Sequence, residues 1–126
     1  MTRLMKTIYV IDDMPEMLET LKTALELSNY EVRAFSSGRE AIQALGEKVP
    51  DVVVTDLDLQ ASISGFDLIG QVRHRFPKLP VIVTSGCAVL PESILQLGVA
   101  AFCPKPLDMN LLLSAVREAV TQCKPG

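Results

Sequence analysis

Residues 7–13, Thr-Ile-Tyr-Val-Ile-Asp-Asp, decide the fold that the sequence predicts. A short apolar run rich in β-branched residues favours a buried strand, and the two carboxylates fall where that strand ends. Further strands are predicted at 30–35, 51–55, 80–84 and 100–103. Asp56 follows the strand at 51–55, Ser85 follows the strand at 80–84, and Lys105 closes the run from Ala100. If the strands are parallel, these polar tips meet at one edge of the sheet, where open α/β folds place ligands.

Amphipathic segments separate the apolar runs and predict helices. The first begins after Asp13, which is expected to cap it, with Pro15 in its first turn. The others are expected at 38–46, 65–76, 90–97 and 108–122, the last capped by Asp108. This alternation predicts a three-layer, flavodoxin-like (βα)5 domain of the α/β class, with a parallel five-stranded sheet of order 2-1-3-4-5. Residues 1–126 are expected to form one domain, with no output domain in this chain.

Composition fits an ordinary compact domain. Of 126 residues, 48% are hydrophobic and 21% are charged, which argues against disorder. The net charge of −3 and the lack of a basic run give no reason to expect direct nucleic acid binding. No apolar stretch approaches the roughly 20 residues that span a bilayer, so we expect a cytoplasmic protein with no membrane contact. Cys87, Cys103 and Cys123 are predicted to be free thiols.

The polar strand tips suit phosphoryl chemistry. Asp12, Asp13 and Asp56 would repel one another when gathered, and a hard divalent ion such as Mg²⁺ would offset that repulsion. Asp56 could then attack phosphorus, with Lys105 and Ser85 holding the transferring group. Taken singly, these residues also fit plainer roles: a helix cap, a strand-ending turn, a loop serine and a solvated lysine.

The chain resembles the receiver domains of two-component response regulators from Thr7 to about Gln122. The resemblance rests on motifs found in the family's order. They are Val-Ile-Asp-Asp at 10–13, Val-Val-Val-Thr-Asp at 52–56, Gly65, Pro-Val-Ile-Val-Thr-Ser-Gly at 80–86 and Phe-Cys-Pro-Lys-Pro at 102–106.

The resemblance implies a role for each site residue. It makes Asp56 the phosphoacceptor. Asp12, Asp13 and Asp56 would bind Mg²⁺ together with the backbone carbonyl of Asp58. The phosphoryl group would contact two residues, Ser85 and Lys105. Thr84 competes for the hydroxyl position, but alignment on Pro80 and Gly86 assigns that position to Ser85.

The resemblance also implies a switch. Ser85 would move toward the phosphoryl group together with the aromatic residue Phe102, remodelling the surface of the fourth helix, fifth strand and fifth helix. The Lys105–Pro106 bond matches one that is cis in the family. The donor would be a phosphohistidine on a sensor histidine kinase or a histidine phosphotransfer protein. A downstream protein would read the switch, a homodimer is left open, and no enzymatic activity beyond slow self-dephosphorylation is expected.

The loop after Asp56 departs from the family pattern. Gln60 stands where proline is usual, and the loop is one residue longer between Gln60 and Ser64. Two alternative functions therefore stay open. One is a receiver-like interaction module that does not use phosphorylation. The other is a haloacid-dehalogenase-like phosphatase, since Asp56-Leu57-Asp58 also resembles the first motif of that family.

Overall fold

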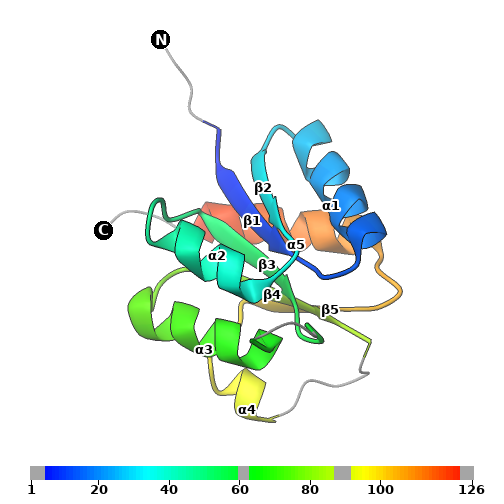
Figure 1. Ribbon diagram of the computed structural model, residues 1–126. Helices are drawn as coiled ribbons and strands as arrows, with labels where there is room; N and C mark the ends of the chain where they lie inside the picture. Colours follow the sequence, from blue (N-terminus) through cyan, green and yellow to red (C-terminus); the bar gives the residue numbers. More distant parts are fainter. Residues whose placement is uncertain (1–4, 60–62, 87–91, 123–126) are drawn as a thin grey trace.

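Strands and helices alternate along the chain, as the sequence predicts (Figure 1). The computed structural model describes residues 5–59, 63–86 and 92–122. The strands are β1 (Thr7–Ile11), β2 (Glu31–Phe35), β3 (Val52–Asp56), β4 (Val81–Ser85) and β5 (Ala101–Pro104). The helices are α1 (Pro15–Leu27), α2 (Gly38–Leu45), α3 (Gly65–Arg75), α4 (Glu92–Leu95) and α5 (Met109–Gln122). All strand pairs are parallel and the order is β2-β1-β3-β4-β5, which confirms the predicted topology.

Each face of the sheet carries its own core. Side chains of Tyr9, Val53 and Val83 pack with helices α2, α3 and α4 on one face. Side chains of Val10, Val54 and Ile82 pack with helices α1 and α5 on the other face. Central strands β1, β3 and β4 are buried throughout, since helices cover both of their faces (Figure 1). Successive residues of a strand point alternately into these two cores, and this alternation decides on which side of the sheet a strand-end residue lies.

Three strands of the site, β3, β4 and β5, end one residue later than predicted. Strands β3 and β4 run to Asp56 and Ser85, so these polar residues belong to the strands and do not follow them. Their backbones continue the parallel ladder, in which Asp56 is in register with Thr84 and Ser85 with Pro104. Sheet hydrogen bonding therefore fixes the backbone that carries both side chains.

The predicted cap of the first helix is wrong. Helix α1 begins at Pro15, and its N-cap residue is Met14, whose side chain makes no capping hydrogen bond. The Met14 N–H instead donates to Oδ1 of Asp12 at 2.9 Å. Asp108 does cap α5, because its Oδ1 accepts from the N–H groups of Asn110 and Leu111.

Two further predictions concern membranes and thiols. In the described part of the chain, no helix is both long and apolar enough to cross a bilayer. Cys103 is a buried free thiol. Cys87 and Cys123 lie outside the described residues.

Gly65 lets helix α3 start directly against the end of strand β3. A Cβ atom at this position would lie 2.5 Å from the Leu57 carbonyl oxygen and 2.6 Å from the Asp56 carbonyl oxygen. These are backbone atoms of the segment that carries the site, so they cannot move aside without displacing it. The sequence needs glycine here for close packing.

We expect Gly65→Ala to lower the free energy of unfolding by about 1–3 kcal/mol, the usual cost of overpacking. Gly70→Ala is the matched control in the same helix, because a Cβ there would have no atom within 4 Å. The control should raise stability by about 0.5–1 kcal/mol through helix propensity. Urea denaturation measures both values, and equal effects would contradict the packing argument.

Candidate functional site

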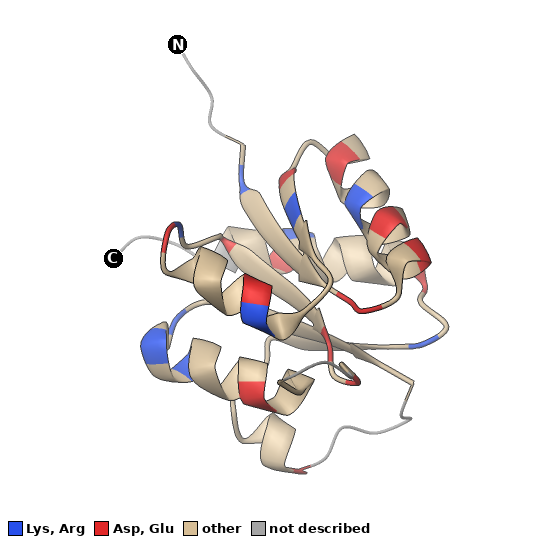
Figure 2. Cartoon of the chain, viewed as in Figure 1, with Lys and Arg blue, Asp and Glu red and all other residues tan. Residues whose placement is uncertain are grey.

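The sequence-predicted polar residues gather at the carboxyl edge of the sheet. Asp12 and Asp13 follow β1, Asp56 ends β3, Ser85 ends β4, and Lys105 follows β5. Strands β1, β3 and β4 are neighbours in the sheet, which brings residues 12, 56 and 85 together from distant parts of the sequence. Figure 2 shows acidic segments of the β1–α1 and β3–α3 connections facing each other at this edge.

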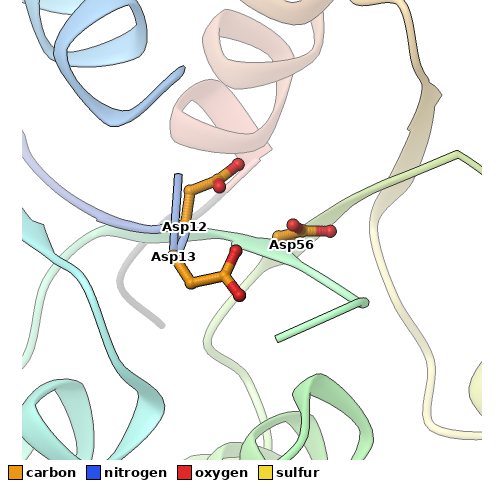
Figure 3. Close-up of side chains that lie close together, drawn as sticks. All are labelled: Asp12, Asp13 and Asp56. Carbon is orange, nitrogen blue, oxygen red and sulfur yellow. The ribbon is translucent and has the colours of Figure 1, made fainter. Parts of the chain in front are cut away.

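Three carboxylates form a cluster. One oxygen from each of Asp12, Asp13 and Asp56 lies within 4.8 Å of the others (Figure 3). Asp12 is fully buried and Asp56 is 3% exposed, whereas Asp13 is partly exposed. Burial raises the pKa of Asp12, and the nearby Asp56 charge adds to that rise. The Met14 N–H and the Lys105 ammonium act against it.

Lys105 supplies the positive charge of the cluster. Its Nζ lies 3.0 Å from Oδ2 of Asp56 and 3.5 Å from Oδ2 of Asp12. Burial alone lowers the pKa of Lys105, but its hydrogen bonds to Asp56 and Asp12 and their charges outweigh burial, so the pKa is raised. The Lys105–Pro106 bond is cis, as the resemblance implies. One ammonium facing three carboxylates leaves the cluster with net negative charge.

The backbone holds Asp56 in a fixed position. Its Oδ1 accepts the Asp58 N–H at 3.0 Å, while its Oδ2 faces Lys105. The Leu57 N–H donates to the Thr84 carbonyl at 2.9 Å, which ties the start of the following loop to strand β4. The carboxylate is therefore oriented before any ligand arrives.

Ser85 and Phe102 belong to the opposite face of the sheet from Asp56. The Ser85 hydroxyl donates to Oδ2 of Asp58 at 3.2 Å, and the Gly86 N–H approaches the same oxygen at 3.4 Å. Phe102 is partly buried against the α2/α3/α4 core, in register with Val83. Hence the sequence-predicted hydroxyl lies near the cluster but bonds to the Asp58 carboxylate.

Sequence reasoning missed two features of this edge. It gave Asp58 a role only through its backbone carbonyl. In the structure the Asp58 N–H donates to Asp56 at the end of β3, and the Asp58 carboxylate accepts from Ser85 at the end of β4. It also treated Thr84 only as a competitor of Ser85. Thr84 is buried in register with Asp56, and its hydroxyl lacks a hydrogen-bond partner among the described residues. The two-residue period of a strand could have placed Thr84 beside Asp56 once the register was known.

Comparison with known proteins identifies the family. The family model described as the response regulator receiver domain matches residues 8–117. The chain belongs to this family. The structure agrees: a receiver domain from Clostridium thermocellum is 30% identical with a TM-score of 0.85, covering 94% of this chain and 96% of that one. A CheY-like receiver protein from Methanospirillum hungatei shares the fold with a TM-score of 0.88 at 24% identity, over 95% of this chain and 97% of that one.

Curated relatives of this receiver domain are longer proteins. KdpE of Mycobacterium tuberculosis, a transcriptional regulatory protein, is 36% identical over 92% of this chain, which spans 51% of KdpE. The DNA-binding transcriptional regulator NtrC of Escherichia coli is 29% identical over 90% of this chain, which spans 24% of NtrC. The transcriptional regulatory protein GlrR of E. coli is 29% identical over 94% of this chain, which spans 27% of GlrR. The chain thus matches between a quarter and a half of these relatives.

We expect Asp12→Asn to stabilise the metal-free protein at neutral pH. Asparagine removes a buried negative charge yet keeps an oxygen for the Met14 N–H. Because folding raises the pKa of Asp12 above 3.8, the folded chain binds more protons than the unfolded chain just above pH 3.8. The stability of the parent therefore falls as pH rises through that interval and stays lowered above the raised pKa.

Thermal unfolding in EDTA at several pH values tests this expectation. At pH 7 the variant should melt about 4 °C higher, the shift that about 1 kcal/mol causes in a domain of this size. The difference should shrink as pH falls toward 3.8. A lower melting temperature for Asp12→Asn at pH 7 would show that its bond to Lys105 outweighs burial and repulsion.

Proposed function

We propose that this receiver domain accepts a phosphoryl group on Asp56 and signals through the change that follows. The observation that carries the proposal is the Asp56 carboxylate itself, which is nearly buried, 3.0 Å from Lys105 and within 4.8 Å of two further acids. A carboxylate can attack phosphorus, and an ammonium beside it can stabilise the charge of the transferring group. Membership of the receiver family supports the same assignment.

The donor set at the cluster fits a divalent cation such as Mg²⁺. Carboxylate oxygens from Asp12, Asp13 and Asp56, with the backbone carbonyl of Asp58, would hold it. The bound ion would shield the negative charge that otherwise keeps an anionic phosphoryl donor away. Partly exposed Asp13 lies on the solvent side of the cluster, where an ion can enter with some of its water.

The transfer step forms one bond and breaks another. An oxygen of Asp56 forms a P–O bond as the P–N bond of a phosphohistidine breaks, and the bonding pair stays on the imidazole nitrogen. Lys105 already lies between Asp12 and Asp56 and can shift its hydrogen bonds to the phosphoryl oxygens. A sensor histidine kinase or a histidine phosphotransfer protein would supply the group in the cytoplasm.

Signalling would follow from the rearrangement around Ser85. Its hydroxyl is bonded to Asp58, so a contact with the phosphoryl group requires an exchange of partners. Strand β4 pairs with β5 through Val83 and Phe102, so movement at the end of β4 can change the packing of Phe102. A downstream protein would then recognise the altered surface of α4, β5 and α5.

Intact mass spectrometry with acetyl phosphate and Mg²⁺ should show one phosphoryl adduct on the parent chain. Asp56→Asn should show none, because an amide cannot act as this nucleophile. Asp67→Asn is the matched control and should keep the adduct, since it changes an exposed acid of helix α3 that does not belong to the carboxylate cluster. An adduct that persists in Asp56→Asn would place the acceptor elsewhere. Sustained turnover of a chromogenic phosphate ester would favour the phosphatase alternative instead.

Mg²⁺ should raise the melting temperature of the parent chain in a concentration-dependent way, because it binds the folded cluster. Asp13→Asn should weaken this response, as it removes one of the three carboxylates without altering the buried pair. Glu19→Gln, which changes an exposed acid of helix α1, is the charge-matched control and should respond like the parent. Equal responses of all three proteins would argue against the cluster as the metal site.

A further inference from the structure

Thr84 carries an unusual buried group. Its side chain is 1% exposed, and within the described part of the chain its hydroxyl has no hydrogen-bond partner. A buried hydroxyl without a partner is unfavourable, because folding removes its hydrogen bonds to water and replaces them with none. Valine would fill nearly the same space without that cost. A function for the hydroxyl in another state of the protein would explain its presence.

The strand register places Thr84 directly beside Asp56. The two residues are partners in the β3–β4 ladder, and Cys103 is the partner of Thr84 on β5. Val54 and Ile82, two residues earlier on β3 and β4, both pack in the α1/α5 core. Since side chains alternate along a strand, Asp56 and Thr84 share that face. Neighbouring strands lie about 4.8 Å apart, which leaves the two side chains adjacent.

The two neighbours of Thr84 on the adjacent strands differ in their strength as hydrogen-bond acceptors. Cys103 packs in the α1/α5 core, and burial raises the pKa of its thiol, so it stays neutral and is a weak acceptor. Asp56 is the stronger acceptor, and each of its oxygens already has one donor in the free protein. Oδ1 accepts the Asp58 N–H, and Oδ2 accepts from Lys105. The Thr84 hydroxyl bonds to neither oxygen, and it has no other partner among the described residues.

Phosphorylation would change which donors bond to the oxygens of Asp56. It brings about −1.5 to −2 charges to Asp56, which attract the Lys105 ammonium toward the phosphoryl oxygens. With phosphorus on Oδ1, the other aspartyl oxygen, Oδ2, then loses its charged donor Lys105. Rotation about a single side-chain bond can turn the Thr84 hydroxyl toward the side chain on the neighbouring strand.

We propose that Thr84 is a positioning residue whose hydroxyl hydrogen-bonds to the phosphorylated form of Asp56. This role rests on the proposed function of Asp56 as phosphoacceptor. Among the described residues the hydroxyl has no partner in the free state, and it gains one in the phosphorylated state, so it favours the latter. It acts beside Ser85 but from the opposite face of the sheet.

Thr84→Val separates this role from a purely structural one. The variant should melt a few degrees higher than the parent in the free state, because it removes an unpaired buried hydroxyl. Its affinity for beryllium trifluoride with Mg²⁺, a phosphoryl analogue, should fall by about 3- to 10-fold, the effect of losing one hydrogen bond. Thr84→Ser keeps the hydroxyl and should retain the parent affinity.

Thr55→Val provides the contrast for stability. Thr55 is also fully buried, one residue from Asp56, but its hydroxyl donates to the Asp56 carbonyl at 3.1 Å. Its replacement should therefore lower the melting temperature, opposite to Thr84→Val.

Analogue binding by the parent decides between the two proposals. An unchanged affinity of Thr84→Val, or a loss of affinity shared by Thr84→Ser, would overturn the role of Thr84 while leaving Asp56 as acceptor. If the parent itself does not bind the analogue, the proposed function fails and this inference fails with it.

Discussion

Repulsion between buried carboxylates at the sheet edge is the constraint on which this structure depends. At an effective dielectric near 20, two carboxylates about 4 Å apart repel each other by about 4 kcal/mol. Carboxylate oxygens of Asp12 and Asp56 lie within 4.8 Å of each other, so their repulsion is of this order, and the ammonium of Lys105 offsets it only in part. The fold can carry this cost because each face of the sheet has an apolar core of its own. An edge of this kind attracts a cation first and an anionic group afterwards.

Alternation along the strands divides the site between the two faces of the sheet. Asp56 and Thr84 point toward the α1/α5 side, whereas Ser85 and Phe102 lie on the side of α3 and α4. The charge change would thus occur on one side, and two of the side chains expected to respond to it, Ser85 and Phe102, lie on the other. Strand β4 links the two sides because Thr84 and Ser85 are consecutive residues. A displacement of its last two residues affects both.

Sequence patterns predicted the topology and the gathering of Asp12, Asp13, Asp56 and Lys105, because five apolar runs and their polar ends leave few parallel arrangements. They did not predict the last residue of β3 or β4, since polar residues can continue a ladder through backbone bonds that hydropathy does not reveal. They also assigned the helix cap to Asp13. Pro15 at the start of α1 makes Met14 the cap residue, and the side chain that reaches the Met14 N–H is that of Asp12. The sequence alone does not show which of two adjacent aspartates accepts this hydrogen bond.

The hydrogen bonds of Asp58 could be found only from the three-dimensional structure. Its N–H donates to Asp56, while its carboxylate accepts from Ser85 and Gly86. One residue therefore connects the acceptor strand to the end of β4, through bonds that a strand-by-strand analysis of the sequence cannot anticipate. A phosphoryl group on Asp56 would bring negative charge close to the Asp58 carboxylate and would compete for the same hydroxyl. Both effects would weaken the Asp58–Ser85 bond, so the charge that arrives at Asp56 would itself favour a change of partner for the Ser85 hydroxyl.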